Sequence, residues 1–310
     1  MSTPGAKFSI SVNLHKQTLN HYNMKALVVG LGIGNLYVNE LTKLGFHVDT
    51  VDPNPDKNPT FQSVGQIIDT YNVAVICTPN FTHESIAREI AGKCNIVFIE
   101  KPGVKDSKAW QRLTADFPNT RFLLVKNNQY RDTIEEFQKL VEQSSVVRIV
   151  WENSNRIPQP GSWFTNKDLA FGGVSRDLIP HMLSYFTVLA NINNNTKVYS
   201  SSVQNHRLED IVNSDYGVVN RNGTYNVDDR CEITFISNNK TWELVADWKT
   251  DKETKIGIEF DYSVFFPLGL CPESAYNKMI KTAVDNVANN DFWQDQYKQD
   301  LWINQQLEAL

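Results

Sequence analysis

From residue 25 onward, short apolar runs alternate with stretches whose apolar residues recur every three or four positions. The apolar runs are typical of buried strands and occur at 25–30, 47–52, 72–79, 95–102 and 120–128. Stretches with helical spacing, including 35–44 and 83–93, lie between them. Strands alternating with helices predict parallel β-α-β units, and near-continuous Val and Ile runs fit a sheet covered on both faces. The first part of the chain is therefore predicted to be an α/β domain with a doubly wound parallel sheet.

The pattern changes after about residue 147. Four strand-like runs with little helical spacing between them follow, at 197–204, 230–237, 241–248 and 256–266. Helices are expected at 132–142, 177–189 and 273–310. Because successive strands without intervening helices favour an antiparallel arrangement, the second part is predicted to be an α+β domain with an open, largely antiparallel sheet.

Composition narrows the class of protein. The 310 residues carry a net charge of −5, with 41% hydrophobic and 21% charged residues, as in ordinary globular proteins. The sequence contains no Lys/Arg run, so no nucleic-acid partner is predicted. No apolar run approaches the roughly 18 residues of a membrane span, and residues 1–23 lack the apolar stretch of a secretory signal. We therefore expect a cytoplasmic protein without a membrane partner. Four cysteines without a CxxC pair, and histidines without ligand spacing, predict no disulfide scaffold and no metal.

The first chemical signal lies where the first strand turns into the first helix. The sequence VVGLGIGN places Gly30 and Gly32 there, and a tight turn that a pyrophosphate approaches needs residues without side chains. A third glycine in a GxGxxG pattern would stand at residue 35, but Asn35 is there and Gly34 precedes it. Asp52 ends the second strand about 20 residues later, where a carboxylate binds ribose hydroxyls and repels a 2′-phosphate. The alternative is an Asp that only begins the DPNP turn. Together the two signals predict a Rossmann domain that prefers NAD to NADP.

Two further segments carry candidate catalytic residues. Lys101 ends the strand at 95–102, at the edge where open α/β sheets bind ligands. Asp177 and His181 follow the Gly172-Gly173 pair at i, i+4 spacing, which places both on one face of a helix. Taken singly, each feature is more typical of solvent-exposed side chains than of a catalytic site.

Together these segments resemble the Gfo/Idh/MocA family (glucose–fructose oxidoreductase, inositol dehydrogenase and rhizopine-catabolism oxidoreductases). The shared features are a TPxxxH segment, an EKP motif, a crossover segment after the fifth strand and a W…GGGxxxDxxxH block. The matching residues are Thr78, Pro79, His83, Glu100, Lys101, Pro102, Asn128, Gln129, Tyr130, Arg131, Trp163, Gly172, Gly173, Asp177 and His181. The sequence departs from the family at Phe171, which replaces the first glycine, and at Ile179, where a glycine is frequent.

The resemblance extends from about residue 24 to the C-terminus and implies a Rossmann domain followed by an open-faced α+β domain. We therefore expect an N-terminal extension at 1–23, a dinucleotide-binding Rossmann domain at 24–127 and a substrate-binding and oligomerisation domain at 128–310. The family commonly forms dimers or tetramers through this second sheet. The runs at 241–248 and 256–266 contain aromatic residues able to form such an apolar face, so a homodimer or homotetramer is expected.

The implied activity is reversible hydride transfer between NAD(P) and a secondary alcohol of a sugar, polyol or nucleotide sugar. His181 would be the general base, Lys101 would stabilise the substrate oxygen, and Asp177 would hold a neighbouring hydroxyl or orient the imidazole. Tyr130, Arg131 and Trp163 are candidates for substrate binding, although a structural role is the stronger expectation for each. The expected cofactor-binding residues are Gly30, Gly32, Ile33, Gly34, Asn35, Asp52, Thr78, Pro79, Asn80, His83, Glu100 and Lys101. For His83, capping or packing is the stronger expectation.

Three alternatives remain open at this point. The first is a catalytically silent dinucleotide-binding regulator, which would keep the fold without the chemistry. The second is an NAD-dependent glycosidase of the same family, and the third is a nucleotide-sugar 3-dehydrogenase with the same catalytic residues. Retention of Lys101, Asp177 and His181 favours an enzyme over a regulator.

Overall fold

The computed structural model describes residues 24–190, 197–237 and 239–310, so the predicted extension at 1–23 lies outside the described residues. The first sheet contains five parallel strands in the order β2-β1-β3-β4-β5. The strands are β1 (Lys25–Val29), β2 (His47–Val51), β3 (Tyr71–Ile76), β4 (Cys94–Ile99) and β5 (Arg121–Leu124), and the connecting helices include α1 (Gly34–Lys43), α2 (His83–Ile90) and α3 (Ser107–Asp116). Since β1 lies between β2 and β3, the carboxyl ends of β1 and β3 form the switch point at which such sheets bind ligands. The predicted doubly wound sheet is confirmed.

The second sheet has six strands in the order β11-β10-β6-β9-β8-β7. They are β6 (Val146–Glu152), β7 (Lys197–Val203), β8 (Arg230–Ser237), β9 (Lys240–Asp247), β10 (Lys255–Phe260) and β11 (Val264–Pro267). Only the β6–β9 pair among these neighbours is parallel, so the largely antiparallel sheet is confirmed. Two strands exceed the four expected, because β6 adds a central strand and the run at 256–266 forms both β10 and β11. Asp261 and Tyr262 make the turn between these two, with positive φ angles of 48° and 54°.

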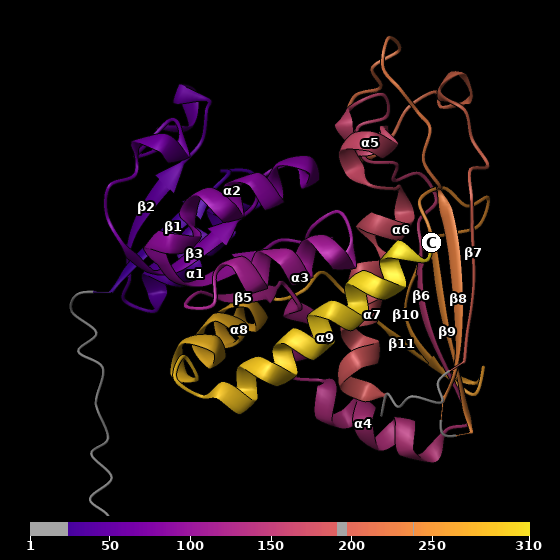
Figure 1. Ribbon diagram of the computed structural model, residues 1–310. Helices are drawn as coiled ribbons and strands as arrows, with labels where there is room; N and C mark the ends of the chain where they lie inside the picture. The colour runs from indigo at the N-terminus through magenta and orange to yellow at the C-terminus, as the bar shows by residue number, and fades with distance from the viewer. Residues whose placement is uncertain (1–23, 191–196, 238) are drawn as a thin grey trace, which may run out of the picture.

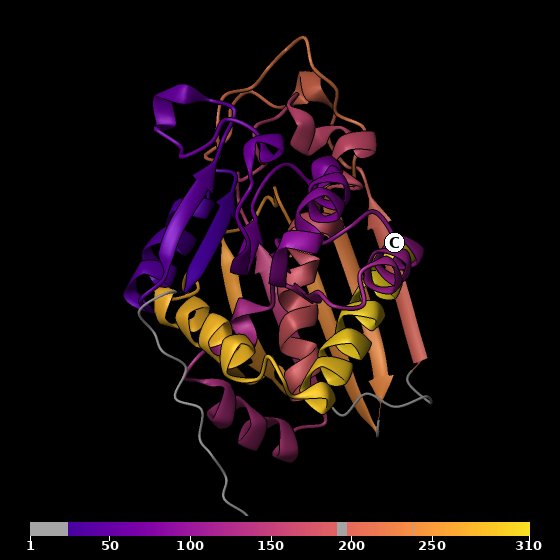
Figure 2. The same cartoon turned by 60° about the vertical axis from the view of Figure 1, so that its left-hand side comes forward.

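The remaining helices of the described chain are α4 (Ile134–Gln143), α5 (Lys167–Ala170), α6 (Val174–Asp177), α7 (Ile179–Leu189), α8 (Glu273–Asp285) and α9 (Asn290–Glu308). Helix α7 lies along the inner face of the second sheet (Figure 2). There the Phe186 ring lies 4.3 Å from Phe235 and 5.1 Å from Trp242, between ring centres. These residues share one apolar cluster with Leu124 and other residues of the first sheet, so the core is continuous between the two sheets.

The last two helices pack against the first sheet, although the sequence assigned them to the second domain. In α8, Met279 and Ile280 join the cluster on the α1 side of that sheet, and Tyr276 meets Tyr37 edge to face at 5.4 Å. Helix α9 contacts α3, α7 and β5 and crosses between the two parts of the molecule (Figure 1). The chain therefore returns to its first domain after completing the second sheet.

A buried ion pair fixes α9 to the end of β5. Lys126 and Asp300 are 1% and 0% exposed and form an ion pair. The backbone N–H of Leu124 donates to the same carboxylate at 3.0 Å. Because two donors from one strand end share this carboxylate, the position of α9 is specified by polar contacts as well as by apolar packing.

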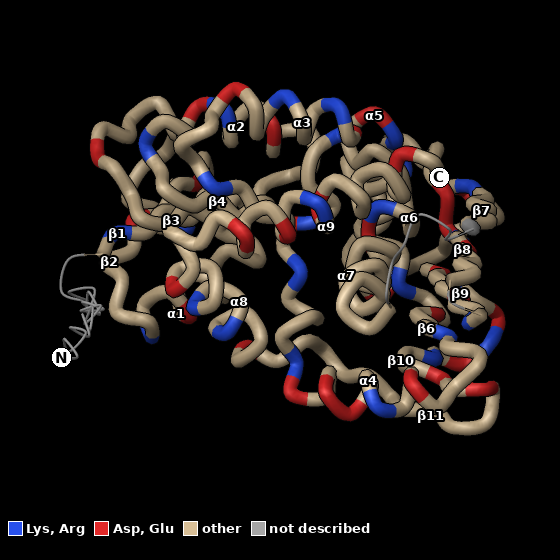
Figure 3. The backbone as a smooth tube through the Cα atoms, turned by 60° about the horizontal axis from the view of Figure 1, so that its bottom comes forward, with Lys and Arg blue, Asp and Glu red and all other residues tan. Residues whose placement is uncertain are grey.

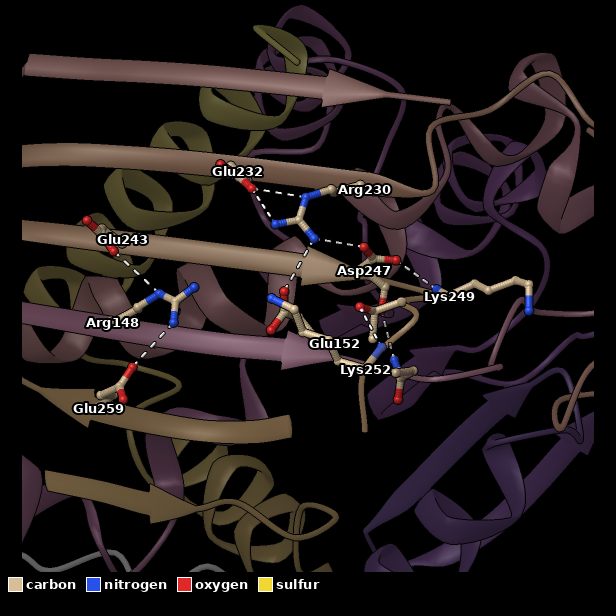
Figure 4. Close-up of polar contacts among 11 residues, drawn as sticks. Arg148, Glu152, Arg230, Glu232, Glu243, Asp247, Lys249, Lys252 and Glu259 are labelled. Carbon is tan, nitrogen blue, oxygen red and sulfur yellow. Dashed lines mark hydrogen bonds and ion pairs between the residues drawn. The ribbon is translucent and has the colours of Figure 1, made fainter. Parts of the chain in front are cut away.

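The outer face of the second sheet differs from the expected apolar surface. Arg230 contacts Glu152, Glu232 and Asp247, and Arg148 contacts Glu243 and Glu259 (Figure 4). The aromatic residues expected there divide between the faces, since Trp242, Trp248 and Phe260 are buried while Tyr262 and Phe265 are exposed. The centre of this face is thus a network of ion pairs, and the apolar expectation is wrong there.

Lys and Arg are interspersed with Asp and Glu over both parts of the molecule (Figure 3). A search of the described helices finds none that is both long and apolar enough to span a bilayer.

Candidate functional site

In the glycine-rich loop after β1, Gly30, Gly32 and Gly34 are each needed for a different structural reason. Gly30 has a φ of 94°, and a Cβ there would lie 2.7 Å from the carbonyl oxygen of Cys77. Gly34 begins α1, where a Cβ would lie 2.9 Å from Cγ1 of Val28. No atom lies within 4 Å of a Cβ built on Gly32, so this glycine leaves open space in front of the loop. Gly34 therefore provides the close helix–strand packing that the third glycine of GxGxxG usually provides, one residue early.

Asp52 lies at the tip of β2 beside this loop. Its carboxylate accepts hydrogen bonds from the backbone N–H of Leu31 (2.8 Å), the N–H of Asn54 (3.0 Å) and the ammonium of Lys57 (2.9 Å). Burial alone would raise the pKa of Asp52, but these donors outweigh burial and lower it. Asn35 closes the loop from the helix side by donating Nδ2 to the Leu31 carbonyl at 3.2 Å. A carboxylate is therefore fixed where a dinucleotide's ribose would be bound.

His83 joins the loop after β3 to the loop after β4. It is fully buried, and its two ring nitrogens lie 2.7 Å from the carbonyl oxygens of Thr78 and Gly103. Burial lowers its pKa. With both nitrogens engaged by the backbone, His83 is placed to position the two loops. Asn80 reaches in the other direction and donates Nδ2 to the Ala170 carbonyl of the second domain at 2.9 Å.

The backbone of the EKP segment is held in place by hydrogen bonds to Glu100. Glu100 accepts a hydrogen bond from the Tyr37 hydroxyl at 2.6 Å and another from the backbone N–H of Lys101 at 3.0 Å. Glu100 is 8% exposed, and burial raises its pKa. The Lys101–Pro102 peptide bond is cis. Glu100 and Tyr37 thus hold the backbone from which the Lys101 side chain extends.

Lys101 crosses from the first domain to Asp177 at the end of α6. The ammonium contacts one carboxylate oxygen, and the indole N–H of Trp248 donates to the other at 3.0 Å. Burial would raise the pKa of Asp177, but Lys101 and Trp248 lower it. Burial likewise opposes the charge of Lys101, yet Asp177 raises the pKa of its ammonium. Both groups are therefore charged at neutral pH and lie 22% and 19% exposed.

The segment before Asp177 owes its shape to Asp228. The Asp228 carboxylate accepts the backbone N–H groups of Gly173 and Ser175, each at 2.8 Å, and so caps α6. A Cβ on Gly173 would lie 1.8 Å from the Asp228 carbonyl oxygen, so only glycine fits. Phe171 replaces the family's first glycine and has a φ of 70°, a conformation that glycine adopts more easily. The departure noted in the sequence is therefore a bulky residue in a backbone conformation typical of glycine.

His181 lies in the first turn of α7, directly after Pro180, which occupies a position that helices tolerate. Its ring stacks on Trp151 with 5.6 Å between ring centres and 28° between planes. Burial and the nearby Lys101 ammonium lower its pKa to about 3, although Asp177 opposes the change. Within the described ranges no hydrogen bond to the imidazole is present, and Asp177 contacts Lys101 and Trp248 instead. His181 is thus neutral and lies near the Lys101–Asp177 pair.

A cleft lies between the two domains at this point. Among its walls are the predicted residues Asn80, Lys101 and Asp177, together with three residues that were not predicted, Phe164, Arg176 and Trp248. Two of these had a sequence signal, since Phe164 follows Trp163 and Arg176 directly precedes Asp177. Trp248 comes from the end of a strand far along the chain, and no local pattern marks it.

The other predicted substrate-binding residues, His181 included, are not among those that line this cleft. Trp163 stacks on Phe164 at 3.8 Å. Tyr130 packs against the apolar cluster of the first sheet, and burial raises its pKa to about 12. Arg131 donates to the Asn128 side chain at 3.0 Å and to the Gly269 carbonyl at 2.8 Å. The contacts of Tyr130 are those of a packing residue, whereas Arg131 is close enough to affect the pKa of His181.

No protein-family model matches the sequence. Among curated proteins, a protein assigned as a UDP-kanosamine synthase oxidoreductase subunit of Amycolatopsis mediterranei (strain S699) is 27% identical over 186 residues. The match covers 54% of this chain and 52% of the relative, so the chain spans about half the length of that curated relative.

Solved structures extend the likeness over nearly the whole chain. GenD2 from gentamicin A biosynthesis, in complex with NAD, has a TM-score of 0.69 at 18% identity and 93% coverage of both chains. A myo-inositol dehydrogenase from Corynebacterium glutamicum has a TM-score of 0.68 at 13% identity, covering 93% of this chain and 95% of its own. Levoglucosan dehydrogenase in complex with NADH has a TM-score of 0.66 at 16% identity, with 93% and 96% coverage. The chain has the fold of the Gfo/Idh/MocA-type oxidoreductases, and the resemblance predicted from its motifs is confirmed.

Proposed function

We propose that this chain is an NAD-dependent oxidoreductase that transfers a hydride between NAD and a secondary alcohol of a sugar, polyol or nucleotide sugar. The observation that carries the proposal is the ion pair of Lys101 with Asp177 beside a neutral His181. An ammonium and an unprotonated imidazole close enough to act on one another are the two groups that oxidation of an alcohol needs. The solved dehydrogenases of the same fold support the same class of reaction.

The residues of the first domain fit a dinucleotide. Gly30 and Gly34 shape the loop, Gly32 leaves the space in front of it free, and Asp52 presents a carboxylate at the tip of β2. Bound NAD would supply the acceptor for the hydride that leaves the alcohol carbon. Because an acidic residue at this position disfavours a 2′-phosphate, we propose NAD rather than NADP as the cofactor. The NAD and NADH complexes among the similar structures support this choice.

The chemistry of the chain's own groups follows from their charge states. His181 accepts the hydroxyl proton, which a neutral imidazole can do and an imidazolium cannot. Lys101 donates a hydrogen bond to the same oxygen and stabilises the negative charge that develops there. Asp177 keeps Lys101 protonated and oriented, and Trp248 fixes Asp177 from the opposite side. Trp151 stacks on the imidazole and limits its rotation. His83, Glu100 and Tyr37 act through the backbone and are positioning residues.

The test is formation of NADH, followed by absorbance, with a panel of polyols, aldoses and nucleotide sugars. Lys101→Met should lower kcat about 100- to 1000-fold while the Kd for NADH changes little. Lys108→Met, an exposed lysine on α3, is the matched control and should retain full activity. Equal losses in kcat and in NADH affinity would contradict the assigned role of Lys101. Tight NADH binding without turnover of any compound would favour the silent regulator, and hydrolysis of a glycoside without accumulation of NADH would favour the glycosidase.

We also propose a homodimer or homotetramer joined through the outer face of the second sheet. Exposed Tyr199, Tyr262 and Phe265 at the margins of that face support it, and the central ion pairs would make its stability depend on salt. Light scattering at micromolar protein measures the mass, and a monomer at low salt would reject this assembly. A cytoplasmic location also stays a prediction, to be checked by cell fractionation.

A further inference from the structure

The surroundings of His181 carry an excess of positive charge. The charges of Lys101, Arg131 and Arg156 lower the pKa of His181, and the carboxylate of Asp177 opposes them by raising it. Arg176 adds a further cation to the wall of the cleft beside Lys101 and Asp177. The whole chain has a net charge of −5, so this local excess has the opposite sign to the protein as a whole.

Arg176 is the most unusual of these cations. It is 9% exposed, and its Nη1 is fully buried without a hydrogen-bond partner. No carboxylate of the described residues forms an ion pair with it. Gly172 makes room for its stem, because a Cβ on Gly172 would lie 2.7 Å from Cγ of Arg176. The backbone turn before α6 is thus shaped to admit this side chain along the wall of the cleft.

The acidic residues that act on Arg176 are engaged by other groups. Asp228 caps α6, Glu308 accepts from the Ser107 hydroxyl at 2.5 Å, and Asp106 accepts the N–H of Ala109 at 2.7 Å. Burial lowers the pKa of Arg176, which means that the structure opposes its charge in the absence of a ligand. A buried guanidinium without a counter-ion is destabilising, and a planar fork of donors is suited to a carboxylate or a phosphate.

Within the described part of the chain, Arg131 and Arg156 also form no ion pair with an acidic side chain. Arg131 bonds to an amide side chain and a carbonyl, and Arg156 lies 4.6 Å from the ring centre of Tyr216. In contrast, Arg148 and Arg230 on the outer face of the sheet each pair with acidic side chains. A dinucleotide's pyrophosphate is accounted for by the glycine loop of the first domain, which leaves these arginines for the other ligand.

We propose that the substrate carries an anionic group, a carboxylate or a phosphate, and that Arg176 binds it while Arg131 and Arg156 strengthen the attraction. The inference rests on the proposed function and narrows it to acidic sugars, sugar phosphates or nucleotide sugars. Binding of the anion would supply the counter-ion that Arg176 lacks. It would also partly neutralise the cations around His181 and so make the imidazole a stronger base when substrate is present.

The experiment compares kcat/KM with NAD for glucose and for three anionic counterparts, namely glucuronate, glucose 6-phosphate and UDP-glucose. These arms separate a carboxylate, a phosphate and a nucleotide diphosphate as the source of the charge. Arg176→Gln should lower kcat/KM for the preferred anionic compound about 10- to 100-fold, mainly through KM, and lower it far less for glucose. Arg176→Lys should recover part of the loss, since it keeps the charge without the fork. Arg112→Gln, an exposed arginine on α3, should behave as wild type.

Equal losses for glucose and the anionic compounds would overturn the inference, as would a change confined to the KM for NAD. If wild type oxidises none of the four, the proposed function is in question, and binding then tests the inference separately. The NADH-bound protein is titrated with each compound, and binding is followed through the fluorescence of tryptophans such as Trp151 and Trp248. Tighter binding of an anionic compound than of glucose, lost in Arg176→Gln, supports the inference, and its absence in wild type refutes it. Circular dichroism of each variant checks that the fold is kept.

Discussion

Replacing Asp177 by Asn tests the electrostatic arrangement of the cleft most directly. The amide still accepts a hydrogen bond from Lys101 or from Trp248, but the negative charge beside the ammonium is lost. Asp177 is what raises the pKa of Lys101 against the opposing effect of burial. In Asp177→Asn the attraction of that carboxylate is lost, so the pKa of Lys101 falls below its present position. The lysine then loses its proton at a lower pH than in wild type.

The size of the effect follows from the burial of the pair. Removing one partner of a buried, hydrogen-bonded charge pair costs about 2–5 kcal/mol. Because these side chains are 22% and 19% exposed, we expect the lower end, about 2–3 kcal/mol of unfolding free energy. Where Lys101 loses its proton, it also loses the charge that strengthens its hydrogen bond to the substrate oxygen. We therefore expect kcat to fall about 100-fold at neutral pH.

The sign of the pH dependence is fixed by the two shifts. The pKa of Asp177 is lowered, so its contribution to stability is present above the unfolded pKa and is lost as pH falls through the folded value. The pKa of Lys101 is raised, so its contribution is present below the unfolded pKa and is lost as pH rises through the folded value. The pair therefore stabilises the protein across the neutral range, and Asp177→Asn removes that stabilisation there.

The assay is a profile of kcat/KM between about pH 6 and 10, with urea unfolding of the same variants. Asp177→Asn should move the alkaline limb to lower pH, and neither protein should show an acidic limb from His181 in this range, since the pKa of His181 is about 3 and loss of Asp177 lowers it further. Asp116→Asn is the matched control, because it breaks an exposed pair with Arg88 and should cost at most about 1 kcal/mol. An alkaline limb at the wild-type position in Asp177→Asn would refute the view that Asp177 sets the charge of Lys101.

Three further outcomes are expected. Gly30→Ala should destabilise the fold and weaken NADH binding, since the φ of Gly30 is 94°. Gly32→Ala should keep the Tm of the free protein and weaken only NADH binding. Calorimetry of each variant with and without NADH measures both effects. Asp300→Asn should cost about 3–5 kcal/mol in urea unfolding because Lys126 stays buried, and Lys126→Met with Asp300→Leu should recover much of it. If the double variant does not recover stability, Asp300 contributes more than compensation of the Lys126 charge, for example through its hydrogen bond from the Leu124 N–H. Asp52→Asn should shift the ratio of kcat/KM values from NAD toward NADP, and an unchanged ratio would assign that carboxylate to the turn alone.

The sequence predicted the fold through features that are local. Val and Ile runs, glycines at the strand–helix turn and a recognisable set of motifs each depend on neighbours in the chain, and they led to both sheets and to the Lys101, Asp177 and His181 set. The return of α8 and α9 to the first sheet was not predicted, because an amphipathic helix does not specify which apolar surface it covers. The contact of Trp248 with Asp177 was not predicted either, because only tertiary packing brings the end of β9 to Asp177.

The charged outer face of the second sheet illustrates a related limit. Alternation along β8 and β9 correctly separates inner from outer positions, but the sequence does not reveal that Arg230 lies opposite Asp247 and near Glu152. Register between strands decides whether neighbouring charges attract or repel, and aromatic content alone suggested an apolar surface. Arg176 was missed for another reason, since its lack of a counter-ion becomes visible only when all of its neighbours are known.

The continuous core between the two sheets has a consequence for how ligands enter and leave. Enzymes that open by a hinge have few contacts between their domains, so that each moves as a rigid body. Here α9 packs on α3, β5 and α7 at once, and separating the sheets would expose side chains such as Trp242 and Leu124 to water. We therefore expect cofactor and product to exchange with little separation of the two sheets, by local movement of loops such as 205–229. The rate of release should respond to substitutions in those segments far more than to changes where the domains join.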